Sequence, residues 1–144
     1  MIHVDSVTAA LYTRLSSDAV LVSSGFTVQE GEALNADIRL TPWVGVYYGS
    51  LPVAPHTLGG ATPWQGELEL FCYVQAGSHR SGQEATRLLG AAQAAVLRAL
   101  DGDRTLGGAV LMLTSLVVTP FERNLHEDTW LFTNEIALKA DVRG

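Results

Sequence analysis

One cysteine and four histidines are the first side chains to consider for chemistry, because a thiolate is a strong nucleophile and an imidazole moves protons or binds metals near neutral pH. Cys72 lies on the apolar side of a segment in which apolar and polar residues alternate, and burial raises the pKa of a thiol, so we interpret it as a core residue. No two histidines have the spacing that places two metal ligands on one helix face. The four are His3, His56, His79 and His126. We expect loop or surface histidines, no metal and no cofactor.

Paired carboxylates and paired glycines are the remaining candidates. Glu67 and Glu69 point to the same side of the alternating segment and could act as acid and base, but this spacing is equally typical of the exposed face of an amphipathic strand, which we favour. Neither Gly59-Gly60 nor Gly107-Gly108 is followed by the Lys-Ser/Thr of a phosphate-binding loop, and turns explain both pairs. The sequence therefore predicts no catalytic residue and no cofactor-binding residue. We expect a protein that is not an enzyme.

The composition favours contacts with other proteins. A chain of 144 residues has the size of one domain, so we expect a single domain over residues 1–144. Hydrophobic residues make up 47% and charged residues only 17%, which predicts a surface poor in charge. The net charge of −6 disfavours specific nucleic-acid binding, which relies on cationic side chains. No apolar stretch reaches the roughly 18 residues of a membrane span, and the N-terminus lacks signal-peptide features, so we expect no membrane partner and synthesis in the cytoplasm.

Two helices are predicted, at the N-terminus and in the centre of the chain. Residues 5–17 carry Val7, Leu11 and Leu15 at helical spacing. Ser81 and Glu84 have the spacing of a capping box and begin a run that Gly102 ends. The apolar stripe of that run comprises Ala85, Leu88, Leu89, Ala92, Val96, Ala99 and Leu100.

Strands are predicted on both sides of the central helix. The clearest is 67–75, whose alternation places Leu68, Leu70, Cys72 and Val74 on the buried side. Residues 38–48 also predict a strand, with an edge or a break at Pro42, and 26–29 predict at most a brief one. Residues 109–119 and 128–141 predict a hairpin with a long connection through Pro120. The fold class is thus α+β, a single domain with a mostly antiparallel β-sheet packed with an N-terminal helix and one longer central helix.

The segment 50–64, SLPVAPHTLGGATPW, has more apolar side chains than an ordinary surface loop would explain. Its prolines and glycine pair exclude a helix or an interior strand, so we expect a long loop. Its apolar side chains are costly to leave together in water, which means that they cover something. The loop either folds back as a lid on its own sheet or contacts another chain, and we favour the second. The candidate partner-binding residues are Leu51, Pro52, Val53, Pro55, Leu58 and Trp64.

From residue 67 to the C-terminus, the succession of features resembles the tail terminator, or tail completion, proteins of long-tailed bacteriophages. The resemblance is carried by the strand ELELFCYV, the helix SGQEATRLLGAAQAAVLRAL, the turn DGDRTLGG before AVLMLTSLVV, and the closing strand WLFTNEIALKA. An N-terminal helix that begins VDSVTAALYTRL fits the same pattern, which covers about three quarters of the chain. These are patterns of hydrophobicity and turns.

The resemblance implies a structural subunit of a homo-oligomeric ring, usually a hexamer. Such a ring caps the tail tube at its final length and offers a docking surface to the head or connector. The partners it implies are further copies of the chain, the tail tube protein and a head-tail connector or neck protein, within a virion assembled in the host cytoplasm. Connectors and stoppers of the neck have similar size and patterns and remain an alternative. A small α+β ligand-binding protein or enzyme is the other alternative.

Overall fold

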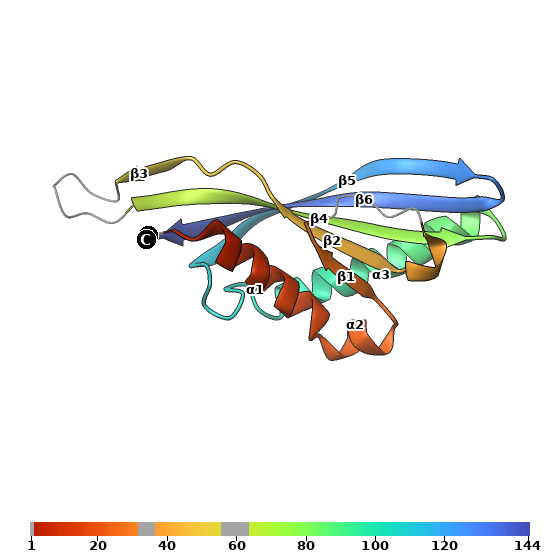
Figure 1. Cartoon of the computed structure of the whole chain (residues 1–144), viewed down its shortest axis with the longest axis horizontal. Coiled ribbons are helices and arrows are strands. Elements are labelled where there is room, and N and C mark those ends of the chain that lie inside the picture. Colours follow the sequence, from red (N-terminus) through yellow and green to blue (C-terminus); the bar gives the residue numbers. More distant parts are fainter. Residues whose placement is uncertain (1, 32–36, 56–63) are drawn as a thin grey trace.

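The computed structural model describes residues 2–31, 37–55 and 64–144 and has a sheet whose helices all pack on one side (Figure 1). Within these residues the helices are α1 (Val4–Ser16), α2 (Ala19–Ser23), α3 (Gly82–Asp101) and the 3-10 helix η1 (Ile38–Leu40). The strands are β1 (Thr27–Glu30), β2 (Trp43–Tyr48), β3 (Val53–Pro55), β4 (Trp64–Ser78), β5 (Met112–His126) and β6 (Thr129–Arg143). The predicted α+β fold class is confirmed.

The sheet has the strand order β1-β2-β4-β6-β5, and β3 pairs with the start of β4 on the side away from β6. All strand pairs are antiparallel except β1 with β2. β4, β5 and β6 form its long part, and each has 15 residues. β5 and β1 are the outermost strands, so this sheet has two different edges.

The core lies between the sheet and the helices. Leu68, Leu70, Cys72 and Val74 of β4 are completely buried, as the alternation predicted. Leu89 and Val96 of α3 belong to the same buried cluster, and so do Leu11 and Leu15 of α1. The core therefore lies between one layer of helices and one face of the sheet.

The central helix begins as its sequence predicts. Ser81 is the N-cap, and its side-chain oxygen accepts a hydrogen bond of 3.0 Å from the backbone N–H of Glu84. The carboxylate of Glu84 accepts from the Ser78 hydroxyl at 3.0 Å and so ties the helix start to the end of β4. Gly102 is the C-cap. Of the predicted stripe only Leu88 is half-buried, and the other members are buried.

The buried carboxylate of Asp18 joins α1, α2 and α3. The backbone N–H of Leu21 donates to Asp18 at 3.1 Å, and Arg98 of α3 binds the same carboxylate. Arg14 of α1 lies 3.6 Å from it and also donates to the carbonyl of Ala99. Burial alone would raise the pKa of Asp18, but these hydrogen bonds and positive charges hold it below its usual value.

Two sequence expectations need correction. The strand expected over 38–48 begins only at Trp43, because Ile38–Leu40 forms η1 and a cis peptide bond precedes Pro42. The break at Pro42 is confirmed, but β2 lies inside the sheet, between β1 and β4.

The expected long connection between the last two strands is also wrong. β5 continues through Pro120 to His126, and only Glu127 and Asp128 separate it from β6. An edge strand tolerates proline because it needs backbone donors on one side only, and a register shift between Pro120 and Glu122 accommodates the extra residue.

Candidate assembly surface

The chemically reactive side chains are placed where they do little chemistry. Cys72 is completely buried, and its burial raises the pKa of the thiol to about 12. His79 shares a hydrogen bond of 3.0 Å with the Thr129 hydroxyl, whereas His56 lies outside the described residues. Across residues 2–31, 37–55 and 64–144, no three His, Cys, Asp or Glu side chains lie close enough to hold a metal ion.

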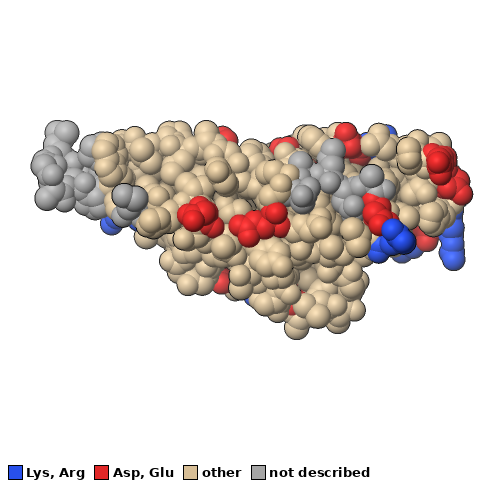
Figure 2. Space-filling view, in the orientation of Figure 1, with Lys and Arg blue, Asp and Glu red and all other residues tan. Residues whose placement is uncertain are grey.

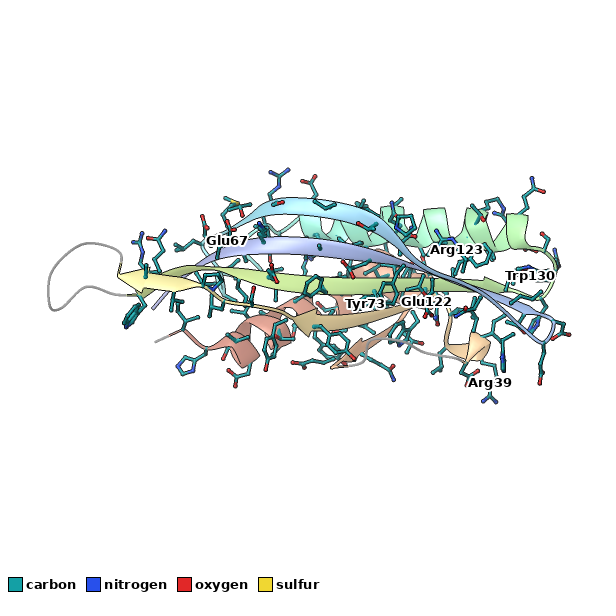
Figure 3. All side chains as sticks on the ribbon, turned by 90° about the horizontal axis from the view of Figure 1, so that it is seen from above. Arg39, Glu67, Tyr73, Glu122, Arg123 and Trp130 are labelled. Carbon is teal, nitrogen blue, oxygen red and sulfur yellow. The ribbon has the colours of Figure 1, made fainter. Side chains whose placement is uncertain are left out.

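The paired carboxylates of β4 have structural partners. Glu67 and Glu69 lie on the sheet face away from the helices, and Figure 3 shows Glu67 from that side. Glu67 lies 3.6 Å from the ammonium of Lys139, and Glu69 accepts a hydrogen bond of 3.3 Å from the backbone N–H of Ser50. Both carboxylates therefore serve as cross-strand and loop contacts in this structure.

The two glycine pairs have different outcomes. Gly107 and Gly108 have φ values of +68° and +90°, which confirms a turn. Gly59-Gly60 lies outside the described residues.

Aromatic rings cluster on the helix-free face of the sheet. The ring centroid of Tyr73 lies 5.8 Å from that of Tyr47, 6.4 Å from Phe71 and 5.0 Å from Phe121. Partial burial raises the pKa of Tyr73, and the charge and hydrogen bond of Glu135 raise it further. The cluster brings together side chains of β2, β4 and β5 on this face, and no described helix covers it (Figures 1 and 3).

The edge strand β5 and the residue before it carry the largest set of exposed apolar side chains in the described chain. Their exposed fractions run from 43% to 59%, and they belong to both faces of the strand. We call this set the β5 patch. It comprises Leu111, Met112, Leu116, Val117, Phe121 and Leu125. The sequence predicted a strand here but not this surface. A sign of it is present in LMLTSLVV, whose apolar residues do not alternate as they would in a strand with one buried face.

A groove of about 230 Å³ runs beside β5, between this strand and the end of α3. Leu97 and Leu100 of α3 and Leu113 and Leu116 of β5 are among its lining residues. The ion pair between Arg104 and Asp101, 2.5 Å long, lies at the same groove. The underside of the β5 edge is therefore accessible, and leucine side chains lie there beside an ion pair.

The candidate residues of segment 50–64 divide into two groups. Leu51 is half-buried and packs against the core, as a lid would. Pro52 is exposed, and Val53 and Trp64 are 46% and 51% exposed, as a contact surface would be. Pro55 pairs through its backbone with Trp64 in the β3–β4 ladder. Leu58 lies outside the described residues.

A second apolar surface follows from this geometry, on the opposite side of β4 from β6 and β5. Its members are Tyr48 at the end of β2, 58% exposed, with Val53 and Trp64. We call these three residues the far-edge patch. The chain thus offers two different apolar patches at two sides of one sheet.

Charge is sparse over much of the surface that Figure 2 shows. Uncharged atoms dominate this face, and Lys and Arg side chains gather mainly toward one end. Val20 and Val22 of α2 add two exposed apolar side chains, at 46% and 61%.

None of the helices in the described ranges combines the length and apolar character needed to cross a bilayer.

No family model matches the chain, and no curated protein matches it. A solved structure does, a chain described as "Virion of native gene transfer agent (GTA) particle". The sequences are 19% identical, the match covers 96% of this chain and 95% of the other, and the TM-score is 0.54. At this identity the likeness shows a shared fold.

Proposed function

We propose that this chain is a structural subunit of a virion, and more specifically of the ring that terminates the tail tube of a phage-like particle. The observation that carries the proposal is the pair of apolar patches on two sides of the sheet. A closed ring needs two different, complementary surfaces on each subunit, which meet head to tail. The β5 patch and the far-edge patch supply two different apolar surfaces for such a contact.

The fold supports the same proposal. The chain shares its fold, over nearly its whole length, with a chain of a gene transfer agent virion. The pattern of strands, helix and turns from residue 67 onward independently resembles tail terminator proteins. In this role the ring caps the finished tail tube and receives the head or connector, and its partners are further copies, the tube protein and a neck protein.

Another neck protein, a connector or a stopper, is the second candidate, because its subunits would need the same two patches. An enzyme finds less support: the thiol is buried, and the carboxylates of β4 are held by neighbouring groups.

The experiment is native mass spectrometry and particle imaging of the chain bound to tail tubes from its own particle. We expect a closed sixfold ring at one end of the tube. Tubes that carry one or two copies would rule out the terminator role. A ring found only on the head vertex would favour a connector instead.

A further inference from the structure

We infer that copies of this chain join by backbone pairing between Ser115–Thr119 of β5 and β3 of a second copy. We call Ser115–Thr119 the open segment. The inference rests on the proposed function for the ring itself and adds the contact that closes it.

The open segment lacks the protection that edge strands normally carry. Native proteins block exposed edges with charges, prolines, bulges or short strands. In β5 most of these features lie in the second half, where Pro120, Glu122, Arg123 and one of the two register shifts occur together. The open segment has no charge and no proline and lies between two register shifts. Its five residues match a typical strand length of roughly 5–6 residues.

Exposed apolar side chains on both faces of the open segment can be buried by an added strand. Leu116 and Val117 are 44% and 55% exposed and project to opposite faces of the sheet. On the helix side, the groove beside Leu97 and Leu100 has room for side chains of an added strand. Strand addition of this kind obtains affinity from main-chain hydrogen bonds and specificity from pockets for alternate side chains.

The strand that pairs with the open segment belongs to a second copy of the chain. Chains with a net charge of −6 repel one another, so a contact between copies is favoured where neither surface carries charge. The open segment has no charged residue, and β3, Val53-Ala54-Pro55, and its exposed neighbour Trp64 have none either. Asp5 and Glu30 lie farther along this side, in the pocket that Tyr48 lines. β3 has three residues, and strand pairing over that length is small beside a standard interface of about 800 Å² per partner, so the groove and the far-edge patch must contribute as well.

The direction of the new pair follows from the sheet. The pairings place β1, β2, β3 and β6 in one direction and β4 and β5 in the other. Rotation about a ring axis roughly parallel to the strands preserves these directions. β5 of one copy therefore meets β3 of the next as an antiparallel pair.

The main test compares lysine variants at two exposed valines. Val117→Lys places a charge on the open segment, and Val22→Lys, on α2, is the matched control at 61% exposure. Assembly of the purified chain, alone and with tail tubes, is followed by analytical ultracentrifugation and native mass spectrometry. We expect Val117→Lys to weaken assembly at least about tenfold and Val22→Lys to leave it unchanged. Equal assembly of both variants would overturn the inference.

A proline pair tests the backbone contact. Leu116 and Val117 are consecutive residues of a strand, so their backbone N–H groups point to opposite sides. One of the variants Leu116→Pro and Val117→Pro therefore removes a hydrogen bond to β6, and the other removes an N–H that points away from the sheet. We expect the variant that keeps the wild-type unfolding midpoint to assemble poorly. If that variant assembles like the wild type, side chains alone make the contact and backbone pairing is excluded.

A mixing experiment tests the choice of partner surface. Val117→Lys blocks one patch and Val53→Lys the other. Head-to-tail joining predicts that each variant alone stays monomeric and that their mixture forms one-to-one pairs. If β5 instead paired with β5 of the second copy, Val53→Lys alone would assemble normally.

The failures of the two proposals are distinguishable. If Val117→Lys still forms the ring that the wild type forms on the tube, the proposed strand pairing is overturned and the terminator role remains. If copies form pairs that Val117→Lys disrupts but never form a ring on a tube, the strand pairing remains and the terminator role is overturned. A wild-type chain that remains monomeric both free and with tubes would overturn both.

Discussion

β4 and β5 are two strands of equal length in one sheet, yet the apolar side chains of β4 are buried and several of those of β5 are exposed to water. In β4 the apolar residues alternate, and Leu68, Leu70, Cys72 and Val74 are completely buried against the helices. In β5 they do not alternate, and Leu116 and Val117 are both exposed. The difference shows that apolar content does not by itself predict burial. A strand inside the sheet has neighbours on both sides, whereas a strand at the edge leaves one side for a partner.

The largest expected effect on this comparison comes from Leu70→Ala in β4. Removing a completely buried leucine side chain should lower the free energy of unfolding by about 2–5 kcal/mol, because the transfer free energy is lost and a cavity remains. Chemical denaturation of the monomer measures it. Val117→Ala in β5 is the matched control and should change stability by less than about 0.5 kcal/mol. Similar losses in both strands would erase the contrast.

A second test uses the buried thiol of β4. Cys72→Ser places a hydroxyl among apolar neighbours, and we expect a loss of roughly 1–3 kcal/mol in unfolding free energy with no other change. Thiol reagents should not react with native wild-type protein until it unfolds. Rapid labelling of the folded chain would mean that the β4 face opens to solvent.

The same thiol predicts a pH dependence with a definite sign. Its pKa is raised from 9.0 to about 12 in the folded chain, so its contribution to stability is complete below pH 9 and is lost as the pH rises from 9 toward 12. Cys72→Ala lacks this component. The wild type should therefore lose stability relative to the variant over that range, measured by denaturation at each pH, and parallel curves would contradict the burial of the thiol.

Trp64→Ala should act on assembly and leave the monomer almost unchanged. The indole is 51% exposed, and large aromatic side chains dominate interface energies, so we expect assembly to weaken by more than about 1 kcal/mol. The melting temperature of the monomer should stay close to that of the wild type. A large drop in that temperature with normal assembly would favour the lid interpretation of segment 50–64.

The smallest effect is expected at the exposed ion pair of β4. Glu67→Gln removes the contact with Lys139, and both side chains are about half exposed, so water and salt screen the interaction. We expect a change in unfolding free energy below about 0.5 kcal/mol by denaturation. A larger loss would indicate that Glu67 does more than pair with Lys139.

Much of the fold could be predicted from local pattern. The alternation of 67–75 predicted the buried face of β4, and Ser81 with Glu84 predicted the start of α3, because period and capping depend on neighbours in sequence. The errors lie where distant contacts decide. Pro120 suggested the end of a strand, but β5 continues through it because no described strand pairs with its outer side.

The candidate surface was only partly visible in the sequence. Segment 50–64 was identified by its apolar side chains, but the sequence could not separate Leu51, which packs inward, from Val53 and Trp64, which face solvent. The β5 patch was missed because a strand that is apolar on both faces reads the same whether it is central or at an edge.

By itself, the sequence determined the helix and strand periods, the inward face of β4, the inert environment of Cys72 and the absence of a recognisable catalytic motif. These properties follow from side-chain type and spacing within a few residues. The strand order was decided only by the tertiary structure, and with it the exposure of Leu116 and Val117 and the groove beside Leu97. The reason is physical: burial and an open hydrogen-bonding edge are properties of a strand's neighbours, and those neighbours lie far away in the sequence.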